Sequence, residues 1–502
     1  MTRLKETLLE YLLVAVIFTF TVAARFYHPD LQSLWFDELY TMTVANPDQS
    51  YGDIATDLST DFHPPLHYFL LNTLFQFMPY NDLTGRYLSI VTGCLTIMLV
   101  YKLGRGLRDK STGYALALLF SVFFYHIKYS QEVRMYIYMF GLAIISTLIF
   151  LKEVKRHYAS NVFNYVLVGA LMVYTQYYGF FIMMGHGFCL WHLRWRRNIR
   201  KRLVWRFVLM WLAILLLYLP WLPVVFQTAG TKHFMKLPAP WYFFEYLYEY
   251  TGKEPVTTLF ILIGLGLYGY DALHQKHKIS FRPSPYRLVV QYIAGSVFVV
   301  TYFISIFKPM LSKHSTLVGL PFLMVMVIHG YLTLRRNHLK WILPVVVVAN
   351  IVNLLFVNEY YFKPVKENFR GITEVVKKDN RYGQNQVVVS QLYRFYNYYF
   401  EQQFSPLRAR NPNEELPTNI PYKPATIVVI NAPFTHVTTP ELEPVDALGF
   451  RILNPRLLSR ADSTAWYLKQ WNDYLKDYYT VDATYHDPMT GKAVAYRFKL
   501  LK

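Results

Sequence analysis

The sequence has few cysteines and few acidic residues for its length, and it lacks the common nucleotide and metal signatures. Among 502 residues there are two cysteines, and 32 acidic residues stand against 51 lysines and arginines. Cys94 and Cys189 fall inside apolar segments, so a disulfide framework is not indicated. The sequence contains no P-loop, Rossmann glycine pattern or zinc motif. We therefore expect no nucleotide cofactor, and an activated substrate would have to arrive ready-made.

Apolar residues are abundant and clustered instead. They make up 54% of the chain, and the mean hydropathy is +0.18. Their runs approach the length of roughly 20 residues that crosses a bilayer. The pattern predicts an α-helical polytopic membrane protein with about 11–13 transmembrane helices. The spans are expected near residues 7–26, 86–103, 111–127, 135–151, 161–178, 179–193, 203–225, 256–273, 287–307, 315–334 and 340–358.

The net charge of +19 has a simpler cause than nucleic-acid binding. Lysine and arginine gather in every second loop, with the densest cluster at residues 194–202, as the positive-inside rule expects. The rule places these loops and the N-terminus in the cytoplasm. The first apolar run lacks a small-residue cleavage site, so we expect a retained span rather than a removed signal peptide. We predict a multi-pass protein of the cell inner membrane with a periplasmic C-terminus.

The composition becomes mixed and polar near residue 360. We expect a membrane domain over residues 1–359, with a long outer loop at 27–85, and a small α/β extracytoplasmic domain over 360–502. Short apolar runs predict strands, and amphipathic runs predict helices. The expected strands lie at 387–389, 427–430, 483–485 and 493–496, with a turn at 487–492, and the expected helices at 367–378 and 392–400.

Two adjacent carboxylates, Asp37 and Glu38, follow the first span. The flanking aromatic residues Trp35, Phe36 and Tyr40 favour a membrane–water boundary. A carboxylate partly withdrawn from water there can be tuned as a general base. The alternative is a solvated pair of acids in a loop.

His63 lies in the same outer loop, ahead of Pro64 and Pro65. An imidazole at the interface can bind phosphate or a metal ion. The alternative is that this segment serves as a helix start, with Asp61 near the positive end of the helix dipole and the prolines in the first turn.

Two further outer loops carry ionisable residues. Gln131, Glu132, Arg134 and Tyr136 lie in a short loop, where ionisable groups at the membrane face are often functional. An internal Glu–Arg neutralisation is equally compatible with that loop. The segment 308–315, which includes Lys313 and His314, offers the cations that a lipid phosphate needs, unless its lysines merely extend from the ends of spans.

Together these elements resemble the GT-C superfamily of membrane glycosyltransferases. The branch most similar to them contains the bacterial relatives of protein O-mannosyltransferases and of the lipid A aminoarabinose transferase, glycosyltransferase families 39 and 83. The resemblance covers nearly the whole chain and rests on the order of four motifs. These are Trp35–Glu38, His63–Leu66, Gln131–Tyr136 and Lys363–Gly371.

The resemblance implies a GT-C fold and an inverting transfer of a sugar from a polyprenyl-phosphate donor to a hydroxyl on a lipid, glycan or protein. Asp37 matches the family's essential acid, with Glu38 beside it. Glu132 would help to hold a divalent metal (Mg, Mn or Zn) or position the acceptor, and Asp37 and His63 are further candidate ligands. Arg134, His63 and the region of Lys313 and His314 would bind the leaving phosphate, and Gln131 and Tyr136 would also bind substrate. Lys313 and His314 stand where relatives often have an Arg–Tyr pair, and lysine lacks the bidentate fork of arginine.

Two other classes of protein remain. A transporter or flippase of a lipid-linked saccharide would also have many spans, but it should carry ionisable residues near the midplane. A non-catalytic scaffold would present the C-terminal domain, but it leaves the outer acids and Arg134 without a purpose.

Overall fold

The computed structural model describes residues 2–61, 63–156, 158–229, 237–276, 285–334, 336–366, 368–378, 386–389, 393–403, 405, 407–410, 426–431, 479–486 and 494–500. The chain divides into two compact units. One consists of Met1–Pro29 and Val44–Glu359, and the other of Asp30–Thr43 and Tyr360–Lys502. A piece of the expected outer loop 27–85 thus belongs to the same unit as the C-terminal domain.

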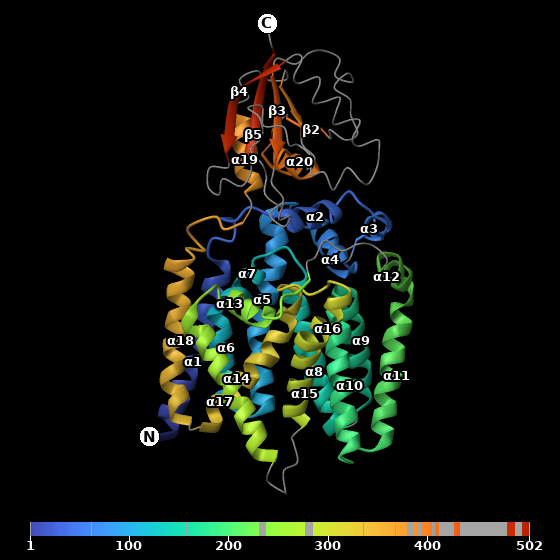
Figure 1. Cartoon of the computed structure of the whole chain (residues 1–502), viewed down its shortest axis with the longest axis vertical. Helices are drawn as coiled ribbons and strands as arrows, with labels where there is room; N and C mark the ends of the chain where they lie inside the picture. The colour runs from blue at the N-terminus through green and yellow to red at the C-terminus, as the bar shows by residue number, and fades with distance from the viewer. Residues whose placement is uncertain are drawn as a thin grey trace. The chain divides into compact units, whose positions relative to one another are not determined.

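The first unit is a bundle of helices (Figure 1). Short 3-10 and π segments, labelled η, continue several of them. The helices are α1 (Thr2–Phe26), α3 (Tyr51–Leu58), α4 (Leu66–Phe75), α5 (Asp82–Leu107), α6 (Lys110–Val122), α7 (Phe124–Ser130), α8 (Tyr136–Lys155), α9 (Ala159–Thr175), α10 (Tyr178–Trp195), α11 (Lys201–Tyr218), η1 (Leu219–Trp221), α12 (Leu222–Ala229), α13 (Tyr242–Tyr250), α14 (Pro255–Lys276), α15 (Pro285–Ala294), η2 (Gly295–Val300), α16 (Thr301–Phe307), η3 (Ser315–Gly319), α17 (Leu320–Leu334), α18 (Arg336–Val352) and η4 (Asn353–Val357).

Within the described residues, seven helical segments are long and apolar enough to cross a membrane. They are Asp82–Leu107, Tyr136–Lys155, Lys201–Thr228, Pro255–His274, Pro285–Phe307, Ser315–Leu332 and His338–Val357. All seven coincide with expected spans. The other four expected spans coincide with α1, α6, α9 and α10 and stay predictions; α6 has 13 residues and α9 has 17.

The N-terminus of α1 and the connection between α10 and α11 lie at the same end of this bundle (Figure 1). Lys110 at the start of α6 pairs with Glu10 of α1, at 3.2 Å between Nζ and Oε1. Arg206 of α11 likewise pairs with the buried Glu153 of α8 at 2.8 Å. The N-terminal helix and the alternate loops therefore share one side of the bundle, as the charge pattern requires.

The expected span at 111–127 is wrong in one respect, because the chain breaks there at Phe123. Phe123 is extended, so α6 ends at Val122 and leaves carbonyl groups without helical partners. The buried guanidinium of Arg25 donates to the carbonyl oxygens of Phe120 and Ser121, at 3.0 Å each. Arg25 thereby compensates for the break and ties α1 to it.

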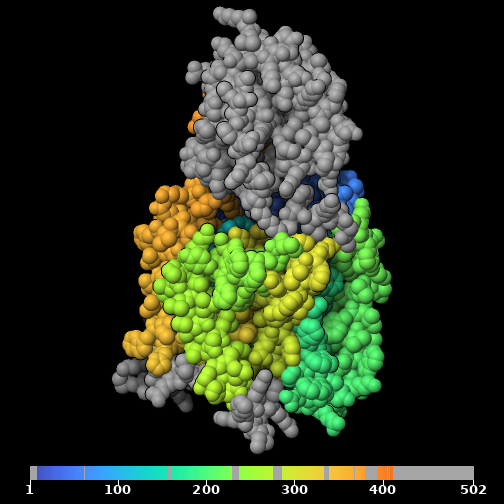
Figure 2. All heavy atoms as spheres, in the orientation of Figure 1, coloured from blue at the N-terminus to red at the C-terminus, as the bar shows by residue number. Residues whose placement is uncertain are grey.

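Large apolar side chains cover the outer faces of the long helices. Figure 2 shows one face of the molecule, on which α11 lies in green, α14 in yellow-green, α15 and α16 in yellow and α18 in orange. A water-soluble protein would bury such side chains, whereas a hydrocarbon environment favours their exposure. They include Trp205, Leu209, Leu216, Leu259, Ile263, Leu273, Val299, Phe303, Trp341, Val345 and Val348.

Two short helices of the first unit, α3 and α4, lie between α2 and α5 in the sequence. Ser50 is the N-cap of α3, and Asp53 completes a capping box with it. Helix α4 begins later than we expected, at Leu66. Pro65 is its N-cap, so the prolines precede the helix rather than forming its first turn. Pro64 disfavours a helical conformation at His63, which keeps that residue in the connecting segment.

The second unit is α/β, as expected. It contains helices α2 (Phe36–Val44), α19 (Phe369–Lys378) and α20 (Tyr393–Gln402). Among its described residues are the strands β1 (Gln386–Val389), β2 (Ala409–Arg410), β3 (Thr426–Asn431), β4 (Tyr479–His486) and β5 (Val494–Leu500). They form one sheet in the order β2-β1-β3-β5-β4, with β1 parallel to β2 and β3 and the remaining pairs antiparallel. The expected turn at 487–492 lies outside the described residues.

Candidate active site

In the first unit, predicted site residues come together from three connecting segments. These segments immediately precede α4, α8 and η3 in the sequence. His63 Nδ1 lies 3.1 Å from the Asp61 carboxylate, and His63 Nε2 lies 3.1 Å from a guanidinium nitrogen of Arg134. The Tyr68 hydroxyl, one turn into α4, lies 3.5 Å from both Asp61 and Arg134. The four side chains form a closed polar cluster.

The hydrogen bonds of His63 define its tautomer. A guanidinium can only donate, so Nε2 must accept from Arg134 and carry no proton. Nδ1 then holds the ring proton and donates it to Asp61. The carboxylate thus fixes the imidazole, and the imidazole holds the guanidinium of Arg134, which is itself 1% exposed.

Tyr136 and His314 extend this cluster. The Arg134 guanidinium carbon lies 5.6 Å from the centre of the Tyr136 ring, a cation–π arrangement. The Tyr136 and His314 rings lie 5.3 Å apart, and the Tyr129 hydroxyl is 2.9 Å from His314 Nδ1. The four predicted residues His63, Arg134, Tyr136 and His314 therefore form one continuous chain of contacts.

Glu132 and Gln131 flank this chain but face different groups. Glu132 is 1% exposed. Burial raises the pKa of Tyr129 well above its ordinary value, and the Tyr125 hydroxyl and the Glu132 carboxylate raise it further, so Glu132 lies within electrostatic range of Tyr129. Gln131 donates to the carbonyl oxygens of Arg25 and Tyr27, at 3.0 and 3.2 Å. Through these hydrogen bonds Gln131 stabilises the C-terminal end of α1.

Lys313 is paired with an acid. Its ammonium lies 3.4 Å from the carboxylate of Glu249 on α13, and 39% of its side chain is exposed. Lys253 approaches the same carboxylate at 3.6 Å. A partly exposed lysine in such a shared pair remains long and mobile enough to reach a second anion.

His67 lies directly behind the cluster and was missed by the sequence. It is almost completely buried on α4. Burial, with a smaller contribution from the nearby Arg134 cation, lowers its pKa to about 3. His67 is thus a neutral ring that supports the cluster from within.

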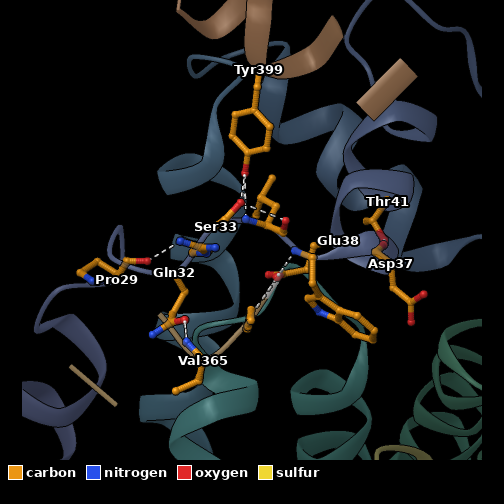
Figure 3. A network of polar contacts seen from close by, with 12 residues as sticks. Pro29, Gln32, Ser33, Asp37, Glu38, Thr41, Val365 and Tyr399 are labelled. Atoms are coloured by element: carbon orange, nitrogen blue, oxygen red, sulfur yellow. Dashed lines mark hydrogen bonds and ion pairs between the residues drawn. The ribbon is translucent and has the colours of Figure 1, made fainter. Parts of the chain in front are cut away.

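Asp37 and Glu38 lie in the second unit, in the first turn of α2, where carboxylates interact favourably with the helix dipole. Their environments differ. Glu38 is fully buried and pairs with Lys366, at 2.8 Å between Oε2 and Nζ. Asp37 is half-buried, and its carboxylate extends away from that of Glu38 (Figure 3).

The residues proposed for a metal were Asp37, Glu132 and His63. Both ring nitrogens of His63 are engaged, one by Asp61 and one by Arg134. Across the described part of the chain, no three His, Cys, Asp or Glu side chains are grouped so as to hold a metal ion. The metal ligands expected from the sequence and the requirement for a divalent ion both stay predictions.

Sequence reasoning also missed Asp61, Tyr68, Tyr129 and Lys366 as members of these networks. Asp61 stands two residues before His63, and that spacing was a usable signal. Lys366 was part of a motif matched by resemblance, but it is separated from Glu38 by 328 positions, so its pairing has no local signature.

Known proteins were compared with this chain. Residues 62–222 match the sequence profile of the family described as dolichyl-phosphate-mannose-protein mannosyltransferase. The structure is similar to that of ArnT from Cupriavidus metallidurans bound to undecaprenyl phosphate, with 12% sequence identity, a TM-score of 0.57 and coverage of 98% of each chain. The apo oligosaccharyltransferase of Archaeoglobus fulgidus gives 10% identity, a TM-score of 0.44 and coverage of 84% of this chain and 69% of that one. No curated protein matches the chain.

The similarity to ArnT shows the fold alone, because the two sequences share only 12% of their residues. The matched profile adds sequence evidence over the segment that supplies His63, Glu132 and Arg134. The chain therefore has a fold similar to that of ArnT, and over residues 62–222 its sequence is similar to the family described as dolichyl-phosphate-mannose-protein mannosyltransferase.

Proposed function

We propose that this protein transfers a sugar from a polyprenyl-phosphate donor to a hydroxyl acceptor at the outer face of the inner membrane, with Asp37 as the base. One observation carries the proposal. The segment that matches the family of dolichyl-phosphate-mannose-protein mannosyltransferases also supplies Arg134 and His63, which lie in hydrogen-bond contact next to Asp61. The similarity to an undecaprenyl-phosphate-bound ArnT supports a polyprenyl carrier for the donor.

The chemistry needs a cation for the leaving group. When the acceptor oxygen attacks the anomeric carbon from the side opposite the phosphate, the carbon–oxygen bond to phosphate breaks and the phosphate keeps the electron pair. Configuration inverts, and negative charge develops on the phosphate. Arg134 supplies a guanidinium that His63 and Tyr68 already orient, and His314 lies beyond the Tyr136 ring. Fixed cations of this kind stabilise developing charge strongly in a dry site.

The acceptor hydroxyl must lose a proton, which Asp37 would take. Glu38 is the less suitable of the two acids, because its carboxylate is buried and already bonded to Lys366. A base that is half-exposed, as Asp37 is, can meet an acceptor arriving from water or from the membrane surface. Glu38 is therefore assigned to the support of Asp37.

The test compares cells that lack the gene with cells complemented by the wild type, Asp37→Asn or Asp48→Asn. Asp48 is an exposed acid of the same outer segment and serves as the matched control. Mass spectrometry of envelope glycolipids and glycoproteins should show one glycoform lost without the gene, restored by the wild type and by Asp48→Asn, and absent with Asp37→Asn. Equal amounts of membrane-inserted protein must be present in all strains. Restoration by Asp37→Asn would refute Asp37 as the base.

A further inference from the structure

The segment that carries Asp37 is built into the second unit, although it lies between the first two membrane helices in the sequence. Gln32 makes the first set of attachments. Its amide nitrogen donates to the carbonyl oxygens of Tyr360 and Lys363, at 3.0 Å each, and its amide oxygen accepts the backbone N–H of Val365 at 2.8 Å. One buried side chain thus satisfies three backbone groups of the chain that enters the C-terminal domain.

Tyr399 of α20 makes the second set of attachments (Figure 3). Its hydroxyl accepts the backbone N–H of Leu34 at 2.8 Å and lies 3.1 Å from the hydroxyl of Ser33. Arg370 of α19 makes three hydrogen bonds to the same segment. Its backbone N–H donates to Ser33 Oγ at 3.2 Å, and its guanidinium donates to the carbonyl oxygens of Asp30 at 2.6 Å and Leu31 at 3.1 Å.

Glu38 then fixes the rotation of α2. Its Oε2 accepts the backbone N–H of Trp35 at 3.3 Å, so it closes the first turn of the helix as an N3 residue. The same oxygen binds Lys366 at 2.8 Å. Because successive residues turn by about 100° around a helix, a Glu38 that points inward to Lys366 must send Asp37 to another side.

The burial of the side chains along α2 shows which face of the helix carries Asp37. Glu38, Thr41 and Met42 are fully buried. Asp37, Tyr40 and Thr43 are half-buried and recur at every third position, so they share one stripe of the helix. The attachment of α2 through Lys366 therefore decides which face of the helix presents the Asp37 carboxylate.

We propose that the second unit positions the base, with Lys366, Gln32 and Tyr399 as positioning residues for Asp37. The C-terminal domain then has a direct part in the reaction, because residues 360–399 determine where the carboxylate stands. This inference rests on the proposed function for the role of Asp37, but the attachment of the segment 30–43 can be tested without it.

The activity test uses purified full-length protein with Lys366→Met, Tyr399→Phe, the double variant Glu38→Gln/Lys366→Met and the control Lys378→Met. Lys378 is an exposed lysine on α19. With a polyprenyl-phosphate sugar that the wild type accepts, Lys366→Met should lower kcat by about 10- to 100-fold, because a displaced reacting group loses much of its rate. KM for the donor should stay within about twofold, because the base does not hold the donor. The double variant should recover part of kcat, because it leaves no buried charge without its partner. Tyr399→Phe should give a smaller loss than Lys366→Met, and Lys378→Met should match the wild type.

Amide hydrogen exchange measured by mass spectrometry supplies the readout that is independent of activity. The segment 30–43 should exchange faster in Lys366→Met than in Lys378→Met, while α5 stays equally protected in both. Unchanged exchange in 30–43, or wild-type kcat in Lys366→Met, would overturn the inference. If the wild type transfers no sugar from any donor, the proposed function fails, and the exchange experiment still decides whether Lys366 holds the segment.

Discussion

At the scale of single residues, the cluster of Asp61, His63, Tyr68 and Arg134 depends on where the proton of the imidazole lies. Asp61 holds the ring proton of His63, and the bare nitrogen of His63 accepts from Arg134. A change at Asp61 therefore reaches Arg134 without touching it. The effect should be smaller than removing Arg134 itself.

Asp61→Asn tests this relay. The asparagine amide can donate to His63 Nδ1 and so favour the opposite tautomer, whose Nε2 proton would face the Arg134 donors. We expect kcat/KM to fall about tenfold, less than the 10²–10³-fold that follows loss of a donor to developing charge. Asp57→Asn, a change at an exposed acid on α3, is the control. Equal kinetics for the two variants would remove Asp61 from the relay.

His67 makes a prediction about pH. Its folded-state pKa is lowered to about 3, whereas an exposed histidine titrates near 6.5. Between these values the unfolded chain binds a proton that the folded chain does not, so stability must fall as the pH is lowered from 6.5 towards 3. The slope from this group is at most about 1.4 kcal/mol per pH unit.

Thermal unfolding in detergent between pH 7.5 and pH 4.5 measures this slope. His67→Gln should flatten the fall in Tm relative to the wild type, because glutamine does not titrate. His338→Gln, at an exposed position on α18, should leave the slope unchanged. If all three proteins lose stability in parallel, other groups are responsible.

At the scale of elements, the close crossing of α14 and α17 depends on glycine. A Cβ added at Gly330 would lie 2.1 Å from the carbonyl oxygen of Gly264, and one added at Gly264 would lie 2.6 Å from Val327. Small residues allow helix backbones to approach in this way within a membrane. Beside the crossing, the Phe260 and Tyr331 rings stack 4.6 Å apart.

Gly330→Ala should push the two helices apart and destabilise the bundle by about 1–3 kcal/mol, the usual range for overpacking. Gly266→Ala, on the same face-to-face pair of helices, is the control, because a Cβ there meets nothing within 4 Å. Alanine favours a helix over glycine, so that control should keep or slightly raise Tm. Chemical or thermal unfolding in detergent decides, and equal Tm values for both variants would refute the crossing.

Many of the helices could be located from the sequence. Apolar runs located the seven segments that are long enough to span, because their length and composition are local properties. The break at Phe123 could not be located in this way, because it depends on Arg25, whose side chain supplies the missing hydrogen bonds from a distant helix. The later start of α4 was missed because two prolines permit either a first turn or a preceding segment.

Part of the candidate site could also be predicted from the sequence, because residue types and loop positions are local properties. His63, Arg134, Tyr136 and His314 came from loops assigned to one face, and the structure joins them. Gln131 and Glu38 were predicted to act on substrate, yet the structure gives both of them partners within the protein. A residue type and its loop can indicate a site, but they do not reveal which distant group already occupies the side chain.

At the scale of the whole molecule, the prediction that remains concerns orientation. The basic loops share one end of the bundle, and the positive-inside rule assigns that end to the cytoplasm. A reporter enzyme that is active only outside the cytoplasm, fused after residue 360, should therefore be active. The same reporter fused after residue 198, between α10 and α11, should be silent. The reverse result would invert the assignment of every loop.

The attachment of the segment 30–43 to residues 360–403 has a consequence for biosynthesis. Glu38 leaves the ribosome 328 residues before Lys366, and at about 5–20 residues per second this interval lasts for tens of seconds. The acid that we assign to catalysis is thus among the first residues translated, whereas two of its proposed positioning residues, Lys366 and Tyr399, follow only after the helices of the first unit. A chain that ends before Lys366 would contain those helices and still be unable to place the acid, so we expect no activity until that part of the chain has been made.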